Sequence, residues 1–292
     1  MRMRPPDSRL TLSLSTLPML DTLKFGFIGG GNMASALIGG LVSRGAPGAN
    51  IVVVDPTEPA RAHAAQTWGA TTIAAPGAEL ADRDVIVLAV KPQQMREVCA
   101  QLAPHLRDSL VLSGAAGIRI QDLSRWLGGH ARVVRAMPNT PALSGMGMTG
   151  LAARAGLGGT DRDIASAIAN AVGKSVWVPD EAQIDAVTAI SGSGPAYVFY
   201  FIEAMQQVAL ELGLSPEAGR LLAAETFIGA ATLAEQSSEP VEVLRERVTS
   251  KGGTTYAALT AMDAAGIKPA FVRAMHAAAA RGKAMGEEFG RD

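Results

Sequence analysis

The sequence predicts an α/β protein, with a mostly parallel sheet covered by helices on both faces and then an all-α C-terminal domain. From residue 24 to about residue 178, short apolar runs alternate with helical patterns, as in a parallel sheet with crossover helices. From residue 181 onward, helical patterns follow one another with glycine or proline breaks between them. We therefore expect two domains, 21–179 and 180–292, after a disordered extension over residues 1–20.

The expected elements follow in chain order. Short apolar runs bounded by turn residues predict strands at 24–29, 51–55, 70–74, 84–90, 109–114 and 132–137. Two weaker strands are expected within 147–154 and 174–179, with a helix over 161–173 between them. In the C-terminal domain, glycine and proline signals predict helix breaks at 191–195, 211–216, 237–240, 250–253 and 265–269.

Composition narrows the possible functions. The 292 residues carry a formal net charge of -1 without a block of like charges, so neither nucleic acid nor an anionic membrane is the expected partner. Cys99 is the only cysteine, which excludes an internal disulfide framework and a Cys-rich zinc site and agrees with a reducing cytoplasm. The longest apolar run, 195–202, is far shorter than the roughly 20 residues of a membrane span. We expect a cytoplasmic protein that binds small molecules and no metal.

A glycine-rich turn joins the first strand to a helical pattern. The segment "FGFIGGGNMASAL" carries Gly29-x-Gly31-x-x-Ala34, which is the spacing of dinucleotide-binding turns. Gly29 allows the tight turn, Gly31 lets the backbone approach a pyrophosphate, and Ala34 permits close packing of the helix. The helix N-terminus offers N–H groups and a positive dipole to the phosphates. The residues expected to bind the cofactor here are Gly29, Gly31, Asn32, Met33 and Ala34.

The second strand ends in Asp55, 24 residues after Gly31. A carboxylate at this position can accept a hydrogen bond from a ribose 2′-OH and repel a 2′-phosphate, which favours NAD. Thr57 and Arg61 lie just beyond and could instead serve a 2′-phosphate if the loop turned Asp55 outward. Asp55 could also simply begin a turn, and the sequence leaves NAD and NADP both open.

Other expected cofactor residues follow later strands, because ligands bind at the carboxyl ends of the strands in open parallel sheets. Val90, Lys91 and Pro92 end the fourth strand, where Lys91 could meet a ribose or a phosphate. Ala115 follows the fifth strand. Asn139 lies between two prolines after the sixth strand, in a stiff polar loop that we expect beside the nicotinamide carboxamide.

Five motifs together resemble one enzyme family. They occur in the order "GFIGGGNMA", "AVKPQQM", "RAMPNTPA", "TAISGSGPAY" and "VTSKGGTT", and the resemblance runs from residue 24 to about residue 285. The sequence is similar to the delta-1-pyrroline-5-carboxylate reductases, which make L-proline in the last step of its biosynthesis. The resemblance implies a Rossmann-like domain, a helical domain that forms a homodimer, and often a ring of dimers. It also implies hydride transfer from NAD(P)H to the C=N carbon of 1-pyrroline-5-carboxylate, at a site in the dimer interface.

The last motif matches the substrate loop of that family at residues 250–255. Gly252 and Gly253 precede a helical pattern, so bare N–H groups at a helix N-terminus can close on a substrate carboxylate. We expect Gly252, Gly253 and Thr254 to bind substrate and Ser250 and Thr255 to be catalytic. The Thr255 hydroxyl would face the ring nitrogen.

Two features of this loop leave questions open. Ser250 or Thr254 could also cap the helix. Lys251 stands where the family usually has proline, which puts the rigidity of the loop in doubt.

Two other functions compete with this reading. One is a related imine or beta-hydroxyacid reductase, but such hydroxyacid enzymes typically use a lysine in the long interdomain helix. The corresponding helical pattern, 195–213, contains no lysine. The other is an NADP-binding sensor that has lost catalysis. The intact Ser250, Gly252, Gly253 and Thr255 argue against a sensor.

Overall fold

The computed structural model describes residues 20–291, and the described chain divides into two compact units. The first unit contains the chain up to Gly192 and again from Gly282 onward, and the second unit is Ser193–Arg281. The change from alternating strands and helices to helices alone predicts a domain boundary after residue 179. In the structure, the first compact unit extends to Gly192. The difference arises because residues 181–192 pack on the sheet of the first unit, where Val187 contacts Gly150. The extension expected over residues 1–20 lies outside the described residues except for Leu20.

One eight-stranded sheet forms the centre of the first unit. Its order is β3-β2-β1-β4-β5-β6-β7-β8, and neighbouring strands are parallel except β6 and β7, which are antiparallel. The α/β fold expected from the sequence is confirmed, including its two weaker strands. The strands are β1 Phe25–Ile28, β2 Ile51–Val54, β3 Thr71–Ile73, β4 Val85–Leu88, β5 Leu110–Ser113, β6 Val133–Met137, β7 Gly147–Ala153 and β8 Gly173–Trp177.

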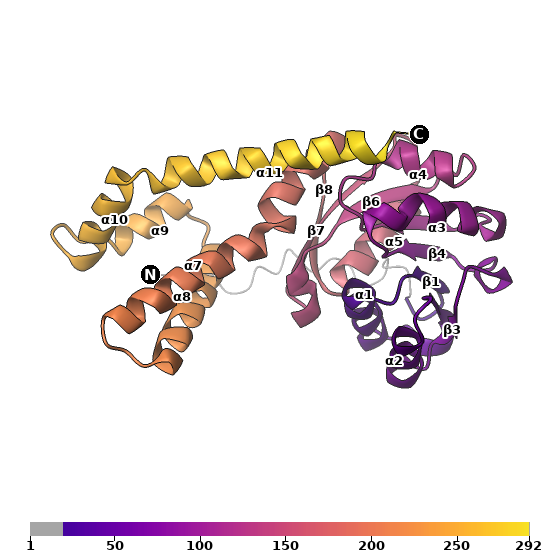
Figure 1. The fold of residues 1–292 in the computed structure, drawn as a ribbon, viewed down its shortest axis with the longest axis horizontal. Coiled ribbons are helices and arrows are strands. Elements are labelled where there is room, and N and C mark those ends of the chain that lie inside the picture. The colour runs from indigo at the N-terminus through magenta and orange to yellow at the C-terminus, as the bar shows by residue number, and fades with distance from the viewer. Residues whose placement is uncertain (1–19, 292) are drawn as a thin grey trace. The chain divides into compact units, whose positions relative to one another are not determined.

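Helices cover both faces of this sheet, as Figure 1 shows. Phe25 and Phe27 of β1 belong to the apolar core shared with α1 and α5, whereas Ile28 belongs to the core shared with α3 and α4. This alternation follows from the twofold repeat of a strand. The helices are α1 Asn32–Ser43, α2 Glu58–Trp68, α3 Met95–Leu102, α4 Ile120–Trp126 and α5 Gly159–Asn170.

The helix expected over 161–173 is displaced towards the N-terminus. It begins at Gly159 and ends at Asn170 as α5, because Gly173 already starts β8. Gly173 has a φ of 152°, and a Cβ there would lie 2.0 Å from the backbone oxygen of Gly147 on β7. The close pairing of β7 and β8 therefore requires glycine at this position and excludes another turn of helix.

The segment that leads out of the first unit contains α6 Ile184–Val187 and a π-helical turn, Thr188–Gly192. Arg135 on β6 fastens this segment, because its guanidinium forms ion pairs with Glu181 at 3.4 Å and with Asp185 at 3.3 Å. Arg135 is buried, so the two carboxylates neutralise a cation that has lost its water. The C-terminal residues from Gly282 pack on the same unit, where Met285 contacts Gly117.

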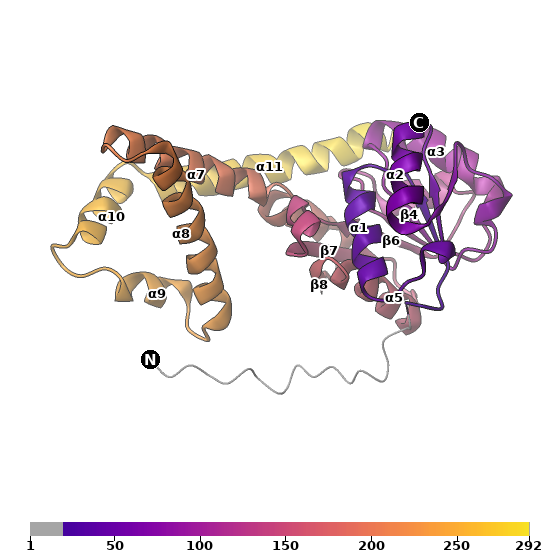
Figure 2. The same cartoon turned by 90° about the horizontal axis from the view of Figure 1, so that it is seen from below.

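The second unit is entirely helical, as the sequence predicts. It contains α7 Gly194–Glu211, α8 Pro216–Gln236, α9 Val241–Arg247, α10 Thr254–Ala264 and the part of α11 Ile267–Phe289 that ends at Arg281. Helices α7 and α8 lie side by side (Figure 1), and a Cβ at Gly219 would come within 2.9 Å of Ala209 Cβ. Figure 2 shows α9 and α10 as short helices joined by an extended loop.

The second unit has almost no core of its own. Its buried residues are Ala209, Gly219 and Ala223, all small, while large apolar side chains such as Phe199 and Ile228 are exposed. Among the described helices, none combines the length and apolarity needed to cross a membrane.

Candidate active site

The glycine turn between β1 and α1 has an open backbone. Gly29 adopts a φ of 101°, and a Cβ there would lie 2.7 Å from the backbone oxygen of Ala89, so only glycine fits. Gly31 is the N-cap of α1, and nothing lies within 4 Å of the position a Cβ would take. No side chain caps this helix, so the N–H groups of its first turn, at Asn32, Met33 and Ala34, are available to a ligand.

Asp55 is held against this turn. Its Oδ2 accepts from the Gly30 amide at 2.8 Å, and its Oδ1 accepts from the Thr57 amide at 2.8 Å and the Thr57 hydroxyl at 2.6 Å. Burial by itself raises the pKa of Asp55, but these hydrogen bonds and nearby Arg61 outweigh it, so the pKa lies below 3.8. Arg61 Nη1 also donates to the Asp55 backbone oxygen at 2.8 Å. The carboxylate is therefore ionised at neutral pH, with one oxygen facing the Gly30 amide and the other facing Thr57 in its own loop.

The next strand ends complete the expected cofactor set. Val90 and Lys91 follow β4, and Lys91 precedes a 3-10 turn that begins at Pro92. Ala115 follows β5 and is buried, and its amide lies 3.4 Å from Ser113 Oγ. All eleven residues expected at the cofactor therefore lie in the first unit, in the segments that follow β1, β2, β4, β5 and β6.

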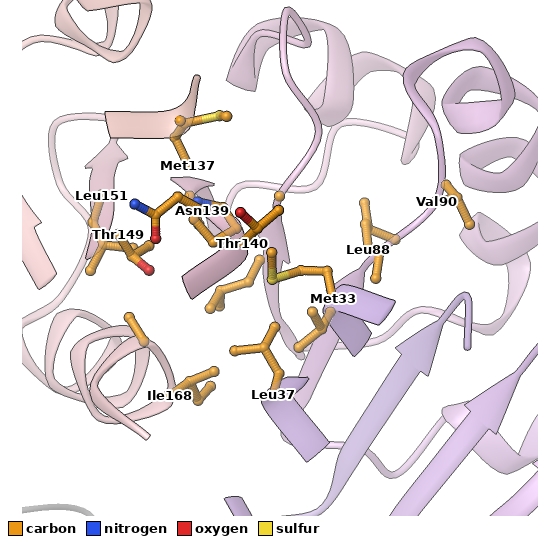
Figure 3. Close-up of a pocket in the computed structure, with 18 of the residues that line it drawn as sticks. Met33, Leu37, Leu88, Val90, Met137, Asn139, Thr140, Thr149, Leu151 and Ile168 are labelled. Carbon is orange, nitrogen blue, oxygen red and sulfur yellow. The ribbon is translucent and has the colours of Figure 1, made fainter. Parts of the chain in front are cut away.

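A cavity of about 370 Å³ opens beside the ends of β4, β5 and β6. Its walls are mainly apolar, and Figure 3 shows Met33 and Leu37 of α1 across from Asn139, Thr149 and Leu151. Of the expected cofactor residues, Met33, Val90, Lys91 and Asn139 line it, and the others do not. The remaining lining residues are Leu37, Val87, Leu88, Ala89, Leu112, Gly114, Ala136, Met137, Pro138, Thr140, Thr149, Leu151, Ile168, Ala169 and Gly192.

The side chain of Asn139 is used by the protein itself. Its Nδ2 donates to the Ser191 backbone oxygen at 3.2 Å and lies 3.3 Å from Ser191 Oγ, while its Oδ1 accepts from the Met148 amide at 2.9 Å. We expected this amide beside the nicotinamide carboxamide. Asn139 does line the cavity, but both ends of its amide hold the cavity wall together.

Thr149 is a polar lining residue that the sequence argument did not single out. It lies in the middle of β7 and is 4% exposed. The only sequence signal for it was a weakly predicted strand, within which one threonine has no special pattern. Only the folded sheet places its hydroxyl beside the cavity.

The expected substrate loop lies in the second unit. Gly252 adopts a φ of 76°, and Gly253 is the N-cap of α10, without a hydrogen bond from any side chain to the cap. Neither Ser250 nor Thr254 therefore caps the helix, which leaves the first N–H groups of α10 open to a ligand. The Gly253 amide donates to the Ser250 backbone oxygen at 3.0 Å, and a Cβ at Gly253 would lie 2.7 Å from Ser250 Oγ.

Lys251 faces a separate polar cavity in the same unit. This cavity, of about 480 Å³, lies between α9 and α10 and is bordered by residues of both charges, Arg245, Glu246, Lys251 and Asp263 among them.

Neither a metal site nor a nucleophilic cysteine has support in the described part of the chain. Within residues 20–291, no three His, Cys, Asp or Glu side chains are grouped as metal ligands. Burial raises the pKa of the Cys99 thiol to about 12, so the thiol stays protonated and is a poor nucleophile at neutral pH.

Known proteins share this fold and these motifs. Residues 181–285 match the family model described as pyrroline-5-carboxylate reductase dimerisation, and residues 24–117 match the one described as NADP oxidoreductase, coenzyme F420-dependent. A pyrroline-5-carboxylate reductase of Pseudomonas aeruginosa is 45% identical over 274 residues, which cover 93% of this chain and 100% of that protein. The chain belongs to the pyrroline-5-carboxylate reductase family. The resemblance carried by the five motifs is thereby confirmed.

Solved structures of pyrroline-5-carboxylate reductases agree with this membership. The enzyme from Coxiella burnetii is 38% identical and superposes with a TM-score of 0.85, covering 90% of this chain and 98% of that chain. A pyrroline carboxylate reductase from Plasmodium falciparum with NADP bound is 30% identical with a TM-score of 0.82, covering 91% and 99% of the two chains.

Proposed function

We propose that this protein reduces 1-pyrroline-5-carboxylate to L-proline, the last step of proline biosynthesis, with NADPH or NADH as the hydride donor. The observation that carries the proposal is the apolar cavity at the carboxyl ends of β4, β5 and β6, in a chain whose relatives are named for this reaction. The cavity can take a planar aromatic ring and keep water away from it.

The residues of the first unit suit a dinucleotide. The pyrophosphate lies against Gly31 and the free N–H groups of Asn32, Met33 and Ala34, because the backbone there is open and α1 directs its positive end outward. Lys91 stands at the cavity edge, where its ammonium can balance a phosphate or bind a ribose hydroxyl. Gly29, Asp55, Pro92, Ala115 and Asn139 shape the surrounding loops. When bound, the cofactor supplies the hydride.

The chain's own part in the chemistry is to bind, orient and protonate the imine. The free N–H groups of Thr254 and Thr255, at the start of α10 next to Gly252 and Gly253, bind the substrate carboxylate. Thr255 presents its hydroxyl to the ring nitrogen. Ser250 supports the loop, because its backbone oxygen accepts from the Gly253 amide. A C–H bond forms at the imine carbon, the π electrons of C=N move to the nitrogen, and that nitrogen takes up a proton.

NADPH is the preferred cofactor in this proposal. Three donors within the protein already bond to the Asp55 carboxylate. It therefore has less hydrogen-bonding capacity left for a ribose 2′-OH than the sequence alone suggested. Arg61 is held beside Asp55 by one of its nitrogens, which leaves other N–H groups for a 2′-phosphate. A relative that is 30% identical binds NADP, which agrees with this choice.

The active form in this proposal is a homodimer in the cytoplasm, and such dimers can assemble further into a ring. The second unit exposes large apolar side chains that its own chain does not cover, including Phe199, Tyr200, Leu222 and Ile228. A second copy can cover them, and the family model over residues 181–285 is described as a dimerisation model. Sedimentation velocity of the purified protein tests the assembly, and a monomer at micromolar concentration would oppose it.

Turnover tests the function. Purified protein is mixed with DL-1-pyrroline-5-carboxylate and NADPH or NADH, and loss of the reduced cofactor is followed together with the formation of proline. We expect turnover with both cofactors and a higher kcat/KM with NADPH. Cofactor binding without any turnover would favour the non-catalytic sensor. Turnover only with other imines, or only of hydroxyacids with NADP+ or NAD+, would favour a related reductase.

A further inference from the structure

One buried hydroxyl in the cavity has no hydrogen-bond partner among the residues that the structure describes. Thr149 is 4% exposed, and its Oγ1 forms no hydrogen bond with any of residues 20–291. Figure 3 shows Thr149 beside Leu151 on the cavity wall, near Asn139. Most buried polar atoms in proteins are hydrogen-bonded, so a hydroxyl that borders an apolar cavity without a partner indicates a ligand.

The sheet fixes the position of this hydroxyl. On β7, Thr149 and Leu151 share the face that lines the cavity, whereas Gly150 between them meets Val187 on the other face. Strand β7 is paired on both sides, with Met137 opposite Gly150 on β6 and Ser175 opposite Thr149 on β8. Because β7 cannot shift without breaking both ladders, the hydroxyl is presented to the cavity in a fixed place.

The other polar groups of the cavity are less suited to the same task. Asn139 uses both ends of its amide within the protein. Lys91 and Thr140 are exposed side chains that water can reach. Thr149 is therefore the one buried polar side chain among the lining residues that still has its hydrogen-bonding capacity available.

We propose that the Thr149 hydroxyl hydrogen-bonds the carboxamide of the bound nicotinamide and so fixes the rotation of the ring. This inference rests on the proposed placement of the nicotinamide in this cavity. A hydroxyl can donate to the carboxamide oxygen or accept from its NH2 group. Fixing the ring determines which face of it is turned to the substrate, so Thr149 is a cofactor-positioning residue for the reduction.

The test compares two ligands that differ only in the nicotinamide. Isothermal titration calorimetry measures the binding of NADP+ and of 2′-phospho-ADP-ribose to the wild type and to Thr149→Val, which keeps the shape and loses the hydroxyl. We expect Thr149→Val to weaken NADP+ binding by about three- to tenfold, the size of one neutral hydrogen bond, and to leave 2′-phospho-ADP-ribose unchanged.

Two further variants separate recognition from misfolding. Thr149→Ser keeps the hydroxyl and should bind NADP+ within about twofold of the wild type. Thr71→Val removes an exposed hydroxyl on the edge strand β3, which does not line the cavity, and should change the binding of neither ligand.

Three results would overturn the proposal. Equal affinity of Thr149→Val and wild type for NADP+ would mean that water satisfies the hydroxyl. An equal loss for both ligands would mean a structural role. If neither ligand bound the wild type, the proposed cofactor site itself would fail, which is a separate outcome.

Discussion

The side chain of Asn139 bonds to Ser191, 52 residues away, with its Nδ2 donating to the Ser191 backbone oxygen at 3.2 Å. The same amide accepts from Met148 at 2.9 Å. One side chain therefore joins the loop after β6, the π-helical turn before α7 and the first part of β7. These three segments form one wall of the cavity, and Gly192 in the turn is close enough that a Cβ would lie 2.5 Å from Met137 Cε.

Asn139→Asp should loosen this wall. A carboxylate keeps the acceptor for Met148 but replaces the donor with an oxygen that faces the Ser191 carbonyl. We expect a loss of about 1–3 kcal/mol in the free energy of unfolding, measured by urea denaturation, together with weaker NADP+ binding. Ser191→Ala is the matched control, since it removes only the Oγ contact and should cost less than about 1 kcal/mol. Equal stability of Asn139→Asp and wild type would contradict the role of Asn139 in holding the cavity wall together.

Gly253→Val should impair the binding of carboxylates. The new Cβ would meet Ser250 Oγ at 2.7 Å, so the loop must shift, and the branched side chain would obstruct the first N–H groups of α10. We expect the Kd for proline to rise roughly tenfold, the loss of one charge-assisted hydrogen bond, without a change in the Kd for NADP+. Lys251→Pro, which restores the usual family residue, serves as the control and should bind proline as well as the wild type. Unchanged proline affinity in Gly253→Val would contradict the proposal that the first N–H groups of α10 bind the carboxylate.

Thr255→Ala should lower kcat while leaving cofactor affinity nearly unchanged. If the hydroxyl assists proton transfer to the ring nitrogen, its loss should lower kcat by roughly 100-fold. Thr255→Ser retains a hydroxyl and should keep most of the rate. Steady-state kinetics with cofactor titration would measure both quantities, and a Thr255→Ala enzyme with wild-type kcat would remove Thr255 from the mechanism.

Arg61→Ala should alter the choice between the two cofactors. If Arg61 binds the 2′-phosphate as proposed, loss of its guanidinium should weaken NADPH binding by about ten- to a hundredfold and affect NADH binding much less. Arg107→Ala is the control, because Arg107 is exposed and precedes β5, at the opposite edge of the sheet from the cavity. Fluorescence titration with each reduced cofactor measures the ratio. An equal loss for NADPH and NADH would refute the assignment of Arg61.

Cys99 should be unreactive in the native protein. Burial raises the pKa of its thiol from 9.0 to about 12, so the folded state holds the proton where the unfolded state has lost it. The stability from this difference is complete below pH 9.0 and is lost as the pH rises towards 12. A thiol reagent at neutral pH should therefore label no cysteine until urea is added, and then one. Rapid labelling of the native protein would show that Cys99 is accessible.

The α/β fold could be predicted from sequence because buried parallel strands leave apolar runs that end at turn residues. The strand ends carried most of the expected cofactor residues for the same reason, since the carboxyl edge of the sheet follows from strand order. The hydrogen-bond partner of each polar side chain at the cavity could not be predicted. Asn139 is hydrogen-bonded to Ser191, which is far from it in the sequence, and Thr149 has no hydrogen-bond partner among residues 20–291.

Two boundaries also depended on contacts that a local pattern does not contain. The end of α5 is set by the close approach of Gly173 to Gly147, which ends the helix before its apolar pattern does. The division at Gly192 depends on packing of residues 181–192 against the sheet, including the ion pairs of Arg135. Composition changes earlier, at about residue 179, because the helical pattern begins before the chain leaves the first unit.

Isotope transfer tests the central claim most directly. The purified protein is given DL-1-pyrroline-5-carboxylate and NADPH carrying deuterium at the transferable position of the nicotinamide, and the product is analysed by mass spectrometry and NMR. We predict L-proline with one deuterium, on the ring carbon that was the imine carbon. Unlabelled proline, or no proline despite cofactor binding, would contradict direct hydride transfer by this protein.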